Sequence, residues 1–276
     1  MKKINIFVVS TGIYNMYINT FIKSIDNFKK YWNGDIKTIL ISDVNNPNFN
    51  INYHIPQLPY SLILLGRIHY IKDILNIYSI DENEIMMLID VDSVFRKMPK
   101  TFYFVLENYI NTNKMCFARS PHIYNHVVEN ENTFHINELH MYNNLDKYAQ
   151  TSLFFGKISA FNKFYEQYVK LEKTYMYSEN NNSKYKIPVM HDQTIINKII
   201  LDNINDYIIN DFIFNGYQFD FINTDDYLTN DFADKDYVCA NETYHLNNYN
   251  DIFIIQKFNN DIKQSIRLSN IKISLR

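Results

Sequence analysis

The sequence predicts an α/β protein whose mixed, mostly parallel sheet is flanked by helices, and two observations lead to this class. Short apolar runs that contain β-branched residues alternate along the chain with longer segments of helical period. Alternation of this kind builds a largely parallel sheet with helices on both faces. The chain has 276 residues, of which 46% are hydrophobic, so it is long enough for one substantial core. We therefore expect a single domain over residues 1–276.

Each expected element follows from a local pattern. Strands are expected where short apolar runs end in turn residues, at 4–9, 37–42, 86–95, 114–118 and 152–156. Helices are expected where apolar residues recur every three or four positions, at 14–31, 66–77, 101–109, 158–176 and 194–203. Two polar segments, 122–149 and 179–186, lack such a period and are predicted to be loops, the first of them a lid. The basic segment 263–276 is predicted to lie at the surface.

Composition and charge argue against several functions. The net charge of −3 argues against nucleic acid as a partner, and the 5 Gly form no glycine-rich phosphate loop. Cys116 and Cys239 are too few for a disulfide framework or a zinc site, which indicates a reducing compartment. The apolar run at 4–9 is too short for a signal peptide, and no segment reaches the length of a membrane span. We expect a soluble cytoplasmic protein, found in the host cytoplasm or the virion if it is viral.

The pair Asp90 and Asp92 is the most informative feature, because it follows directly on the apolar run 86–89. Open α/β sheets bind ligands at the carboxyl ends of their strands. Side chains alternate along an extended chain, so a bend is needed before both carboxylates can face one ion. The functional interpretation is a hard divalent cation with oxygen ligands that bridges to a diphosphate. The structural interpretation is a solvated turn, where Asp is common, and the motif alone leaves both open.

A second polar cluster, His191, Asp192 and Gln193, precedes the helix expected at 194–203. Asp192 is placed as an N-cap or first-turn acid, and this structural role would suffice to explain it. Alternatively, a helix start on a ligand-facing loop presents an acid, an amide and an imidazole to a substrate. The segment by itself does not decide between the two.

Four blocks in order along the chain resemble glycosyltransferase family 6, which contains the histo-blood-group A/B transferases and the α-1,3-galactosyltransferases. They look like the family's arginine helix, Asp-Val-Asp strand, Phe-Phe-Gly-Gly strand and His-Asp-Glu block, and they lie at 66–71, 88–95, 148–156 and 191–198. The resemblance extends to about residue 230. It implies the GT-A fold, a Rossmann-like nucleotide-sugar transferase fold. The nucleotide-binding half, the half for donor sugar and acceptor, and the C-terminal tail would be 1–95, 96–250 and 251–276.

The resemblance also implies a retaining transferase that moves a hexose from a UDP-sugar donor to a hydroxyl of a glycan acceptor. Galactose or glucose is the favoured sugar, with N-acetylgalactosamine as a further candidate. Asp90 and Asp92 would hold Mn²⁺, or Mg²⁺ in its place, against the diphosphate. The metal would neutralise charge on the departing UDP and make it a better leaving group. Residues 122–149 and 211–231 would contact the acceptor, but they carry no recognisable code for it.

By the same resemblance, further residues would surround the donor. Thr11 and Tyr14 would contact the uracil, and Asp192, beside His191, would hold hydroxyls of the donor sugar. Arg67 would pair with a phosphate or with the donor sugar, and its alternative is a surface charge on a helix. Cationic side chains of the tail are candidates to close over the diphosphate: Lys257, Lys263 and Arg267.

Leu153 aligns with the small residue that helps the family choose its donor sugar. If Leu153 points into the donor pocket, its side chain occupies the volume that a 2-acetamido group needs. Overpacking of that kind costs roughly 1–3 kcal/mol, which predicts galactose or glucose as the transferred sugar. Strand alternation leaves a second orientation open, in which Leu153 faces the core and Ser152 faces the donor.

The chain departs from the family's pattern at Gln193, where the family has glutamate, and at Lys157, where it has a second glycine. The glutamate is the family's candidate nucleophile. An amide can neither form the usual glycosyl ester nor supply a full negative charge beside an oxocarbenium ion. We therefore expect retention without double displacement, with departure and attack on the same face of the sugar.

Three alternatives are weighed against this hypothesis. The first is a hexosyltransferase of the glycogenin-like family 8, which shares the fold, the donor class and the metal and normally has an amide in the region of Gln193. The C-terminal His-x-x-Gly-x-x-Lys motif of that family is absent from this chain, although His245 could supply a metal ligand. A haloacid-dehalogenase-type phosphatase also has Asp-x-Asp after an apolar strand, and Asp225-Asp226 could be its late acidic pair. Its strand normally lies near the N-terminus, however, and Ser93 replaces its Gly. A catalytically impaired protein that binds a sugar or nucleotide is suggested by Gln193.

Overall fold

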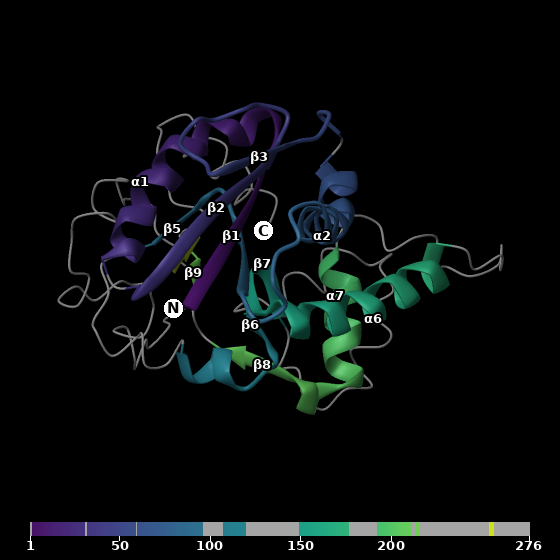
Figure 1. Ribbon diagram of the computed structural model, residues 1–276. Coiled ribbons are helices and arrows are strands. Elements are labelled where there is room, and N and C mark those ends of the chain that lie inside the picture. Colours follow the sequence, from purple (N-terminus) through teal and green to yellow (C-terminus); the bar gives the residue numbers. More distant parts are fainter. Residues whose placement is uncertain are drawn as a thin grey trace, which may run out of the picture.

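A computed structural model shows the fold (Figure 1). The residues that it describes are 2–30, 32–58, 60–95, 107–119, 149–176, 192–210, 213–215 and 254–256. Sequence expectations for the lid, for the loop at 179–186, for most of 211–231 and for the basic tail lie outside these residues, as do His191, His245 and the pair Asp225-Asp226.

A mixed seven-stranded sheet forms the centre, in the order β3-β2-β1-β4-β7-β6-β8. Its strands are β1 (Lys2–Ser10), β2 (Gly34–Ser42), β3 (Ile51–His54), β4 (Ile85–Asp90), β6 (Met115–Arg119), β7 (Ala149–Lys157) and β8 (Tyr207–Asn210). The first four strands run parallel to one another, β7 runs antiparallel to β4 and β6, and β8 runs parallel to β6. The predicted α/β class with a mixed, mostly parallel sheet is confirmed.

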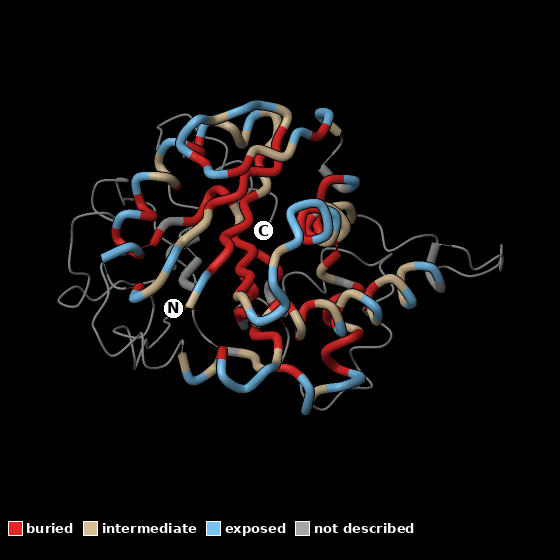
Figure 2. The backbone as a smooth tube through the Cα atoms, viewed as in Figure 1, coloured by how far each residue is buried: buried red, intermediate tan, exposed pale blue. Residues whose placement is uncertain are grey.

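Helices cover both faces of this sheet. They are the 3₁₀ helix η1 (Gly12–Tyr17), α1 (Ile18–Lys29), α2 (Tyr60–Ile77), α6 (Ile158–Met176) and α7 (Asp192–Asp202). Alternation along β1 divides the core, because Ile6 packs in one cluster with Phe21 of α1, whereas Phe7 packs in the other with residues of α2, α6 and α7. Both clusters are buried along the central strands (Figure 2). None of the described helices combines the length and apolar character that crossing a bilayer requires.

The acidic stretch at 86–95 is divided between two sheets. Strand β4 ends at Asp90, a turn occupies 91–92, and β5 (Ser93–Phe95) then enters a separate three-stranded sheet, β5-β10-β9. In that sheet β10 (Ile254–Gln256) pairs antiparallel with β5 and parallel with β9 (Ile213–Asn215). The bend that the Asp-x-Asp pair requires is therefore present.

The sequence patterns located most elements and missed some boundaries. Strands β1, β2, β6 and β7 and helix α6 are confirmed. Strands β3, β8, β9 and β10 were not predicted, and α2 begins at Tyr60 instead of Gly66, because its first turns are mostly apolar and show no period. The helix predicted at 14–31 begins as the 3₁₀ helix η1, and α7 begins at Asp192. Of the helix predicted at 101–109, only 107–109 lies within the described residues, and those are helical.

Candidate functional site

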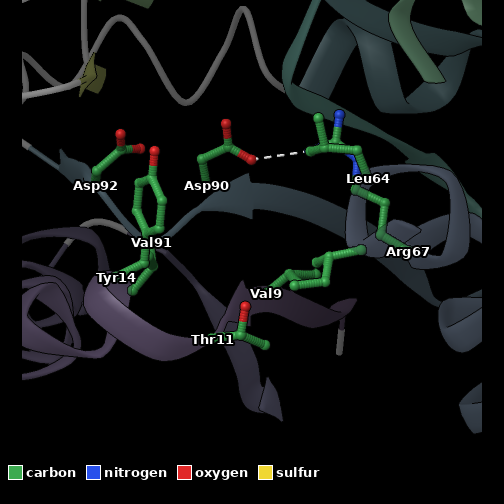
Figure 3. Close-up of a pocket in the computed structure, with 9 residues that line it drawn as sticks. Val9, Thr11, Tyr14, Leu64, Arg67, Asp90, Val91 and Asp92 are labelled. Atoms are coloured by element: carbon green, nitrogen blue, oxygen red, sulfur yellow. Dashed lines mark hydrogen bonds and ion pairs between the residues drawn. The ribbon is translucent and has the colours of Figure 1, made fainter. Parts of the chain in front are cut away.

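The topology predicts where a ligand binds. The chain builds β1, β2 and β3 toward one edge and then returns to place β4 on the other side of β1. Ligands of open α/β sheets bind at such a switch point, beyond the carboxyl ends of the two strands. A pocket lies there, and it is lined by Val9, Thr11, Tyr14, Ile63, Leu64, Arg67, Asp90, Val91 and Asp92 (Figure 3). The empty space between these residues is about 460 Å³, a figure that includes open solvent at the mouth of the pocket.

Both acids of the predicted metal pair line this pocket. The turn after β4 brings Asp90 and Asp92 onto the same side, and in Figure 3 their carboxylates project in the same direction. The side chain of Asp90 is 28% exposed, whereas Asp92 is buried, with 6% of its surface exposed. The geometry of the turn therefore allows two carboxylates to face one ligand.

Arg67 lies beneath these acids and is almost completely buried, with 2% of its side chain exposed. Its guanidinium donates through Nη1 to Asp90 at 2.9 Å, through Nε to Asp192, and through Nη2 to the Thr151 carbonyl at 2.9 Å and hydroxyl at 2.7 Å. The alternative that Arg67 is a surface charge on a helix is wrong, because α2 presents it to the sheet and to α7. Its pairing with a phosphate or donor sugar stays a prediction.

An irregularity in β7 places Thr151 against Arg67. Phe117 of β6 pairs with Phe154, but the next residue, Ala118, pairs with Gln150, so β7 has extra residues at 151–153 relative to β6. Thr151 consequently reaches Arg67 on one face of the sheet. Leu153 packs into the core cluster that contains Phe21 and is fully buried. The core-facing orientation is thus the one adopted, and the steric argument for the donor sugar loses its geometric basis.

Asp192 is the first residue of α7, and it is fully buried. Its carboxylate pairs with Arg67 and lies 3.5 Å from the Thr151 hydroxyl. Gln193 is half-buried, and its carbonyl accepts a hydrogen bond of 2.9 Å from Asn197 Nδ2. The structure therefore joins Asp90 and Asp192 through Arg67, although the roles predicted for Asp192 and Gln193 toward a sugar stay predictions.

The acids of the pocket wall are of the kind that bind a hard cation. Among the described residues that line the pocket, Asp90 and Asp92 are the acids, and Arg67, which also pairs with Asp192, is the base. Among the described residues, no three His, Cys, Asp or Glu side chains are grouped to hold a metal. A Mg²⁺-like ion that also binds phosphates needs only one or two carboxylates, so Asp90 and Asp92 fit an ion whose other ligands arrive with a nucleotide. Ser93 Oγ, buried directly after Asp92, has no hydrogen-bond partner within the described part of the chain.

Sequence reasoning overlooked three residues around the pocket. Thr151 lies just before the strand expected at 152–156, and its contact with Arg67 accompanies the irregular register between β6 and β7. Asn197 is fully buried and pairs with both backbone groups of Ala149, at 2.6 and 2.8 Å. Asp43 looked like an ordinary turn residue after β2, yet it anchors η1. A buried polar residue at position 197, within an otherwise apolar helix face, was the one available signal.

Comparison with known proteins adds no assignment. No protein-family model matches the chain, and no curated protein matches it significantly. The class that the fold and site define is an α/β protein with an acidic pocket at the switch point of its sheet.

Proposed function

We propose that this protein is a metal-dependent, retaining glycosyltransferase with a GT-A fold, which transfers a hexose from a UDP-sugar to a hydroxyl of a glycan. The observation that carries the proposal is the turn after β4, which brings Asp90 and Asp92 onto one wall of a pocket beside the carboxyl end of β1. A nucleoside diphosphate requires a surface for its base and a cationic counterpart for its phosphates: Thr11 and Tyr14 would form the surface, and an ion held by Asp90 and Asp92 would be the counterpart.

Different residues of the pocket would contact different parts of the donor. Thr11 and Tyr14, just after β1, would contact the nucleoside. Asp90 and Asp92 would hold Mn²⁺ or Mg²⁺, which when bound neutralises charge on the diphosphate. Arg67 would keep the Asp90 carboxylate directed toward the pocket, because its Nη1 holds one carboxylate oxygen at 2.9 Å.

The reaction exchanges one bond at the anomeric carbon. The bond from that carbon to the phosphate oxygen breaks, the acceptor oxygen forms the new bond, and the acceptor proton passes to the departing phosphate. Gln193 would only orient or stabilise the sugar, since an amide does not form a glycosyl ester. Attack on the face from which UDP departs gives retention without an enzyme-bound sugar.

A second candidate, a protein that binds a nucleotide sugar without turnover, is favoured by one observation. Asp192, which the family resemblance assigns to the donor sugar, is fully buried and paired with Arg67. A carboxylate in this position supports the pocket from behind and contacts a sugar only if the helix start moves.

The test is a panel of UDP-galactose, UDP-glucose and UDP-N-acetylgalactosamine with Mn²⁺, scored for UDP release with and without candidate glycans. The proposal predicts release from at least one donor, which EDTA stops. Binding of UDP without any release supports the second candidate. Hydrolysis of an aryl phosphate, with no response to UDP-sugars, would instead indicate the phosphatase.

A further inference from the structure

The short helix η1 has three distinct faces. A 3₁₀ helix has 3.0 residues per turn, so residues three apart lie on the same face. Thr11 and Tyr14 line the pocket, whereas Ile13 and Met16 are 62% and 52% exposed. On the third face, Gly12 and Asn15 form hydrogen bonds with Asp43.

Asp43 holds that third face. Its carboxylate accepts a hydrogen bond of 2.9 Å from Asn15 Nδ2 and one of 3.3 Å from the Gly12 N–H. Burial, the largest single influence, raises the pKa of Asp43, but hydrogen bonds from Asn15, Gly12 and Ser42 outweigh it and hold the pKa below 3.8. Asp43 is therefore a carboxylate at neutral pH, and both of its principal bonds go to η1.

The ends of two central strands complete the anchor. Ser10 and Ser42 are neighbours in the register of β1 and β2, and each is only 1% exposed. Their hydroxyls donate to Asn15 Oδ1, at 2.8 Å from Ser10 and 3.3 Å from Ser42. Both ends of the Asn15 amide are thereby fixed, one by the strand ends and the other by Asp43.

The backbone at Gly12 makes this conformation specific. Its φ of +58° lies in the left-handed region, and a Cβ at this position would lie 2.8 Å from Gln57 Nε2. Glycine thus allows the conformation by which the chain passes from β1 into η1, and the hydrogen bonds of Asp43 and Asn15 hold it there. Tyr14 extends from it into the pocket with Tyr17 packed beside it, at 6.1 Å between ring centroids.

We propose that the Asp43–Asn15 pair is a positioning element for the nucleoside, and that it fixes the pocket wall formed by Thr11 and Tyr14. The inference rests on the proposed function, since it assigns the nucleoside part of the donor to this wall. Asp43 itself does not line the pocket. Loss of the pair therefore weakens nucleotide binding and raises the KM for the donor, while kcat changes little because the acids after β4 are untouched.

The experiment is a cycle of Asp43→Ala, Asn15→Asp and the exchange variant Asn15→Asp/Asp43→Asn. The exchange retains the bond between the two side chains, an acceptor for the Gly12 N–H and an acceptor for the two serines. The amide placed at position 43 donates to the carboxylate placed at position 15 and accepts from Gly12, and that carboxylate also accepts from the two serines. Asn15→Asp alone sets two carboxylates against each other. Asp81→Ala is the matched control, because Asp81 also accepts from an asparagine side chain and a backbone N–H, but in an exposed turn before β4.

Two measurements are made on each variant: amide hydrogen exchange of residues 11–17 without ligand, and the Kd for UDP in Mn²⁺. In Asp43→Ala we expect faster exchange in this segment and about tenfold weaker UDP binding, because ordering of the wall must then accompany binding. The exchange variant should restore both, and Asp81→Ala should change neither.

Three results would contradict the account in different ways. Unchanged hydrogen exchange in Asp43→Ala would overturn the anchor. If Asn15→Asp/Asp43→Asn restores slow amide hydrogen exchange but not UDP binding, Asp43 contacts the nucleotide directly. This result would overturn the positioning role. A wild-type protein with a protected segment 11–17 that binds no UDP would overturn the proposed function and, with it, the assignment to a nucleoside, while the anchor itself would stand.

Discussion

Replacing Arg67 by methionine removes the group that joins the strand β4 to helix α7. The guanidinium and the Asp192 side chain are 2% and 1% exposed, so the substitution leaves a buried carboxylate without its cation. Breaking a buried ion pair in this way costs about 3–5 kcal/mol. For a chain of this size we expect a fall in Tm on the order of 10 °C, from roughly 2–4 °C per kcal/mol.

The assay is thermal and urea unfolding followed by circular dichroism, with two comparison variants. Arg67→Met/Asp192→Asn removes both charges, so it should recover much of the stability that Arg67→Met loses. Lys198→Met breaks a surface pair with Asp202 on the same helix and should cost less than about 1 kcal/mol. If the free energy of unfolding of Arg67→Met lies within about 1 kcal/mol of the wild-type value, the buried network does not have the role described. The same holds if the double variant is no more stable than the single one.

Three further outcomes are expected. Gln193→Ala should slow transfer without abolishing it, because an amide only orients the sugar, and a glycosyl adduct trapped on Gln193 or Asp192 in the wild type would contradict this. Asn197→Ala should lower the free energy of unfolding measured in urea by about 2–4 kcal/mol, because it leaves the N–H and C=O of Ala149 unpaired. Asn203→Ala loses only the bond from its side chain to the Ile199 carbonyl, so it should lower this free energy by less than about 1 kcal/mol. The hydrogen bond with Glu172 raises the pKa of His69 above 6.5. The pair therefore contributes fully to stability below pH 6.5, and this contribution is lost as the pH rises through the folded-state pKa. The free energy of unfolding of His69→Gln should depend less on pH than that of wild type between about pH 6 and 8.

The parts of the fold that sequence reasoning located are those fixed by short-range patterns. The apolar runs of β1 and β4 are buried on both faces of the sheet, so they are continuous in the sequence and easy to recognise. The bend between Asp90 and Asp92 also followed from local geometry, because an extended chain cannot direct both carboxylates to one ion. The early start of α2 was missed because residues 62–65 are apolar whether exposed or buried, with Leu62 51% exposed, and this removed the periodic signal.

The connections within the site depend on contacts that no local pattern contains. Arg67 and Asp192 are 125 positions apart, and they meet only because α2 and α7 pack on the same face of the sheet. The orientation of Leu153 was left open because strand alternation alone does not say which face of β7 a residue takes; Leu153 pairs with Ile89 of β4, and both pack in the cluster that contains Phe21. Asp43 follows β2 as many turn acids do, and only its bonds to Gly12 and Asn15 distinguish it.

The most direct test of the central claim is calorimetric titration of UDP into the wild-type protein and Asp92→Asn, each with Mn²⁺ and with EDTA. Asn has nearly the same shape as Asp but carries no charge, so the variant should keep its fold and lose the metal. We predict that the wild type binds UDP only with Mn²⁺ and gains about 2.7 kcal/mol of stability at a UDP concentration of about 100 Kd, and that Asp92→Asn shows neither effect. Equal UDP binding by wild type and Asp92→Asn, or binding by the wild type that EDTA does not change, would contradict the metal-dependent nucleotide site.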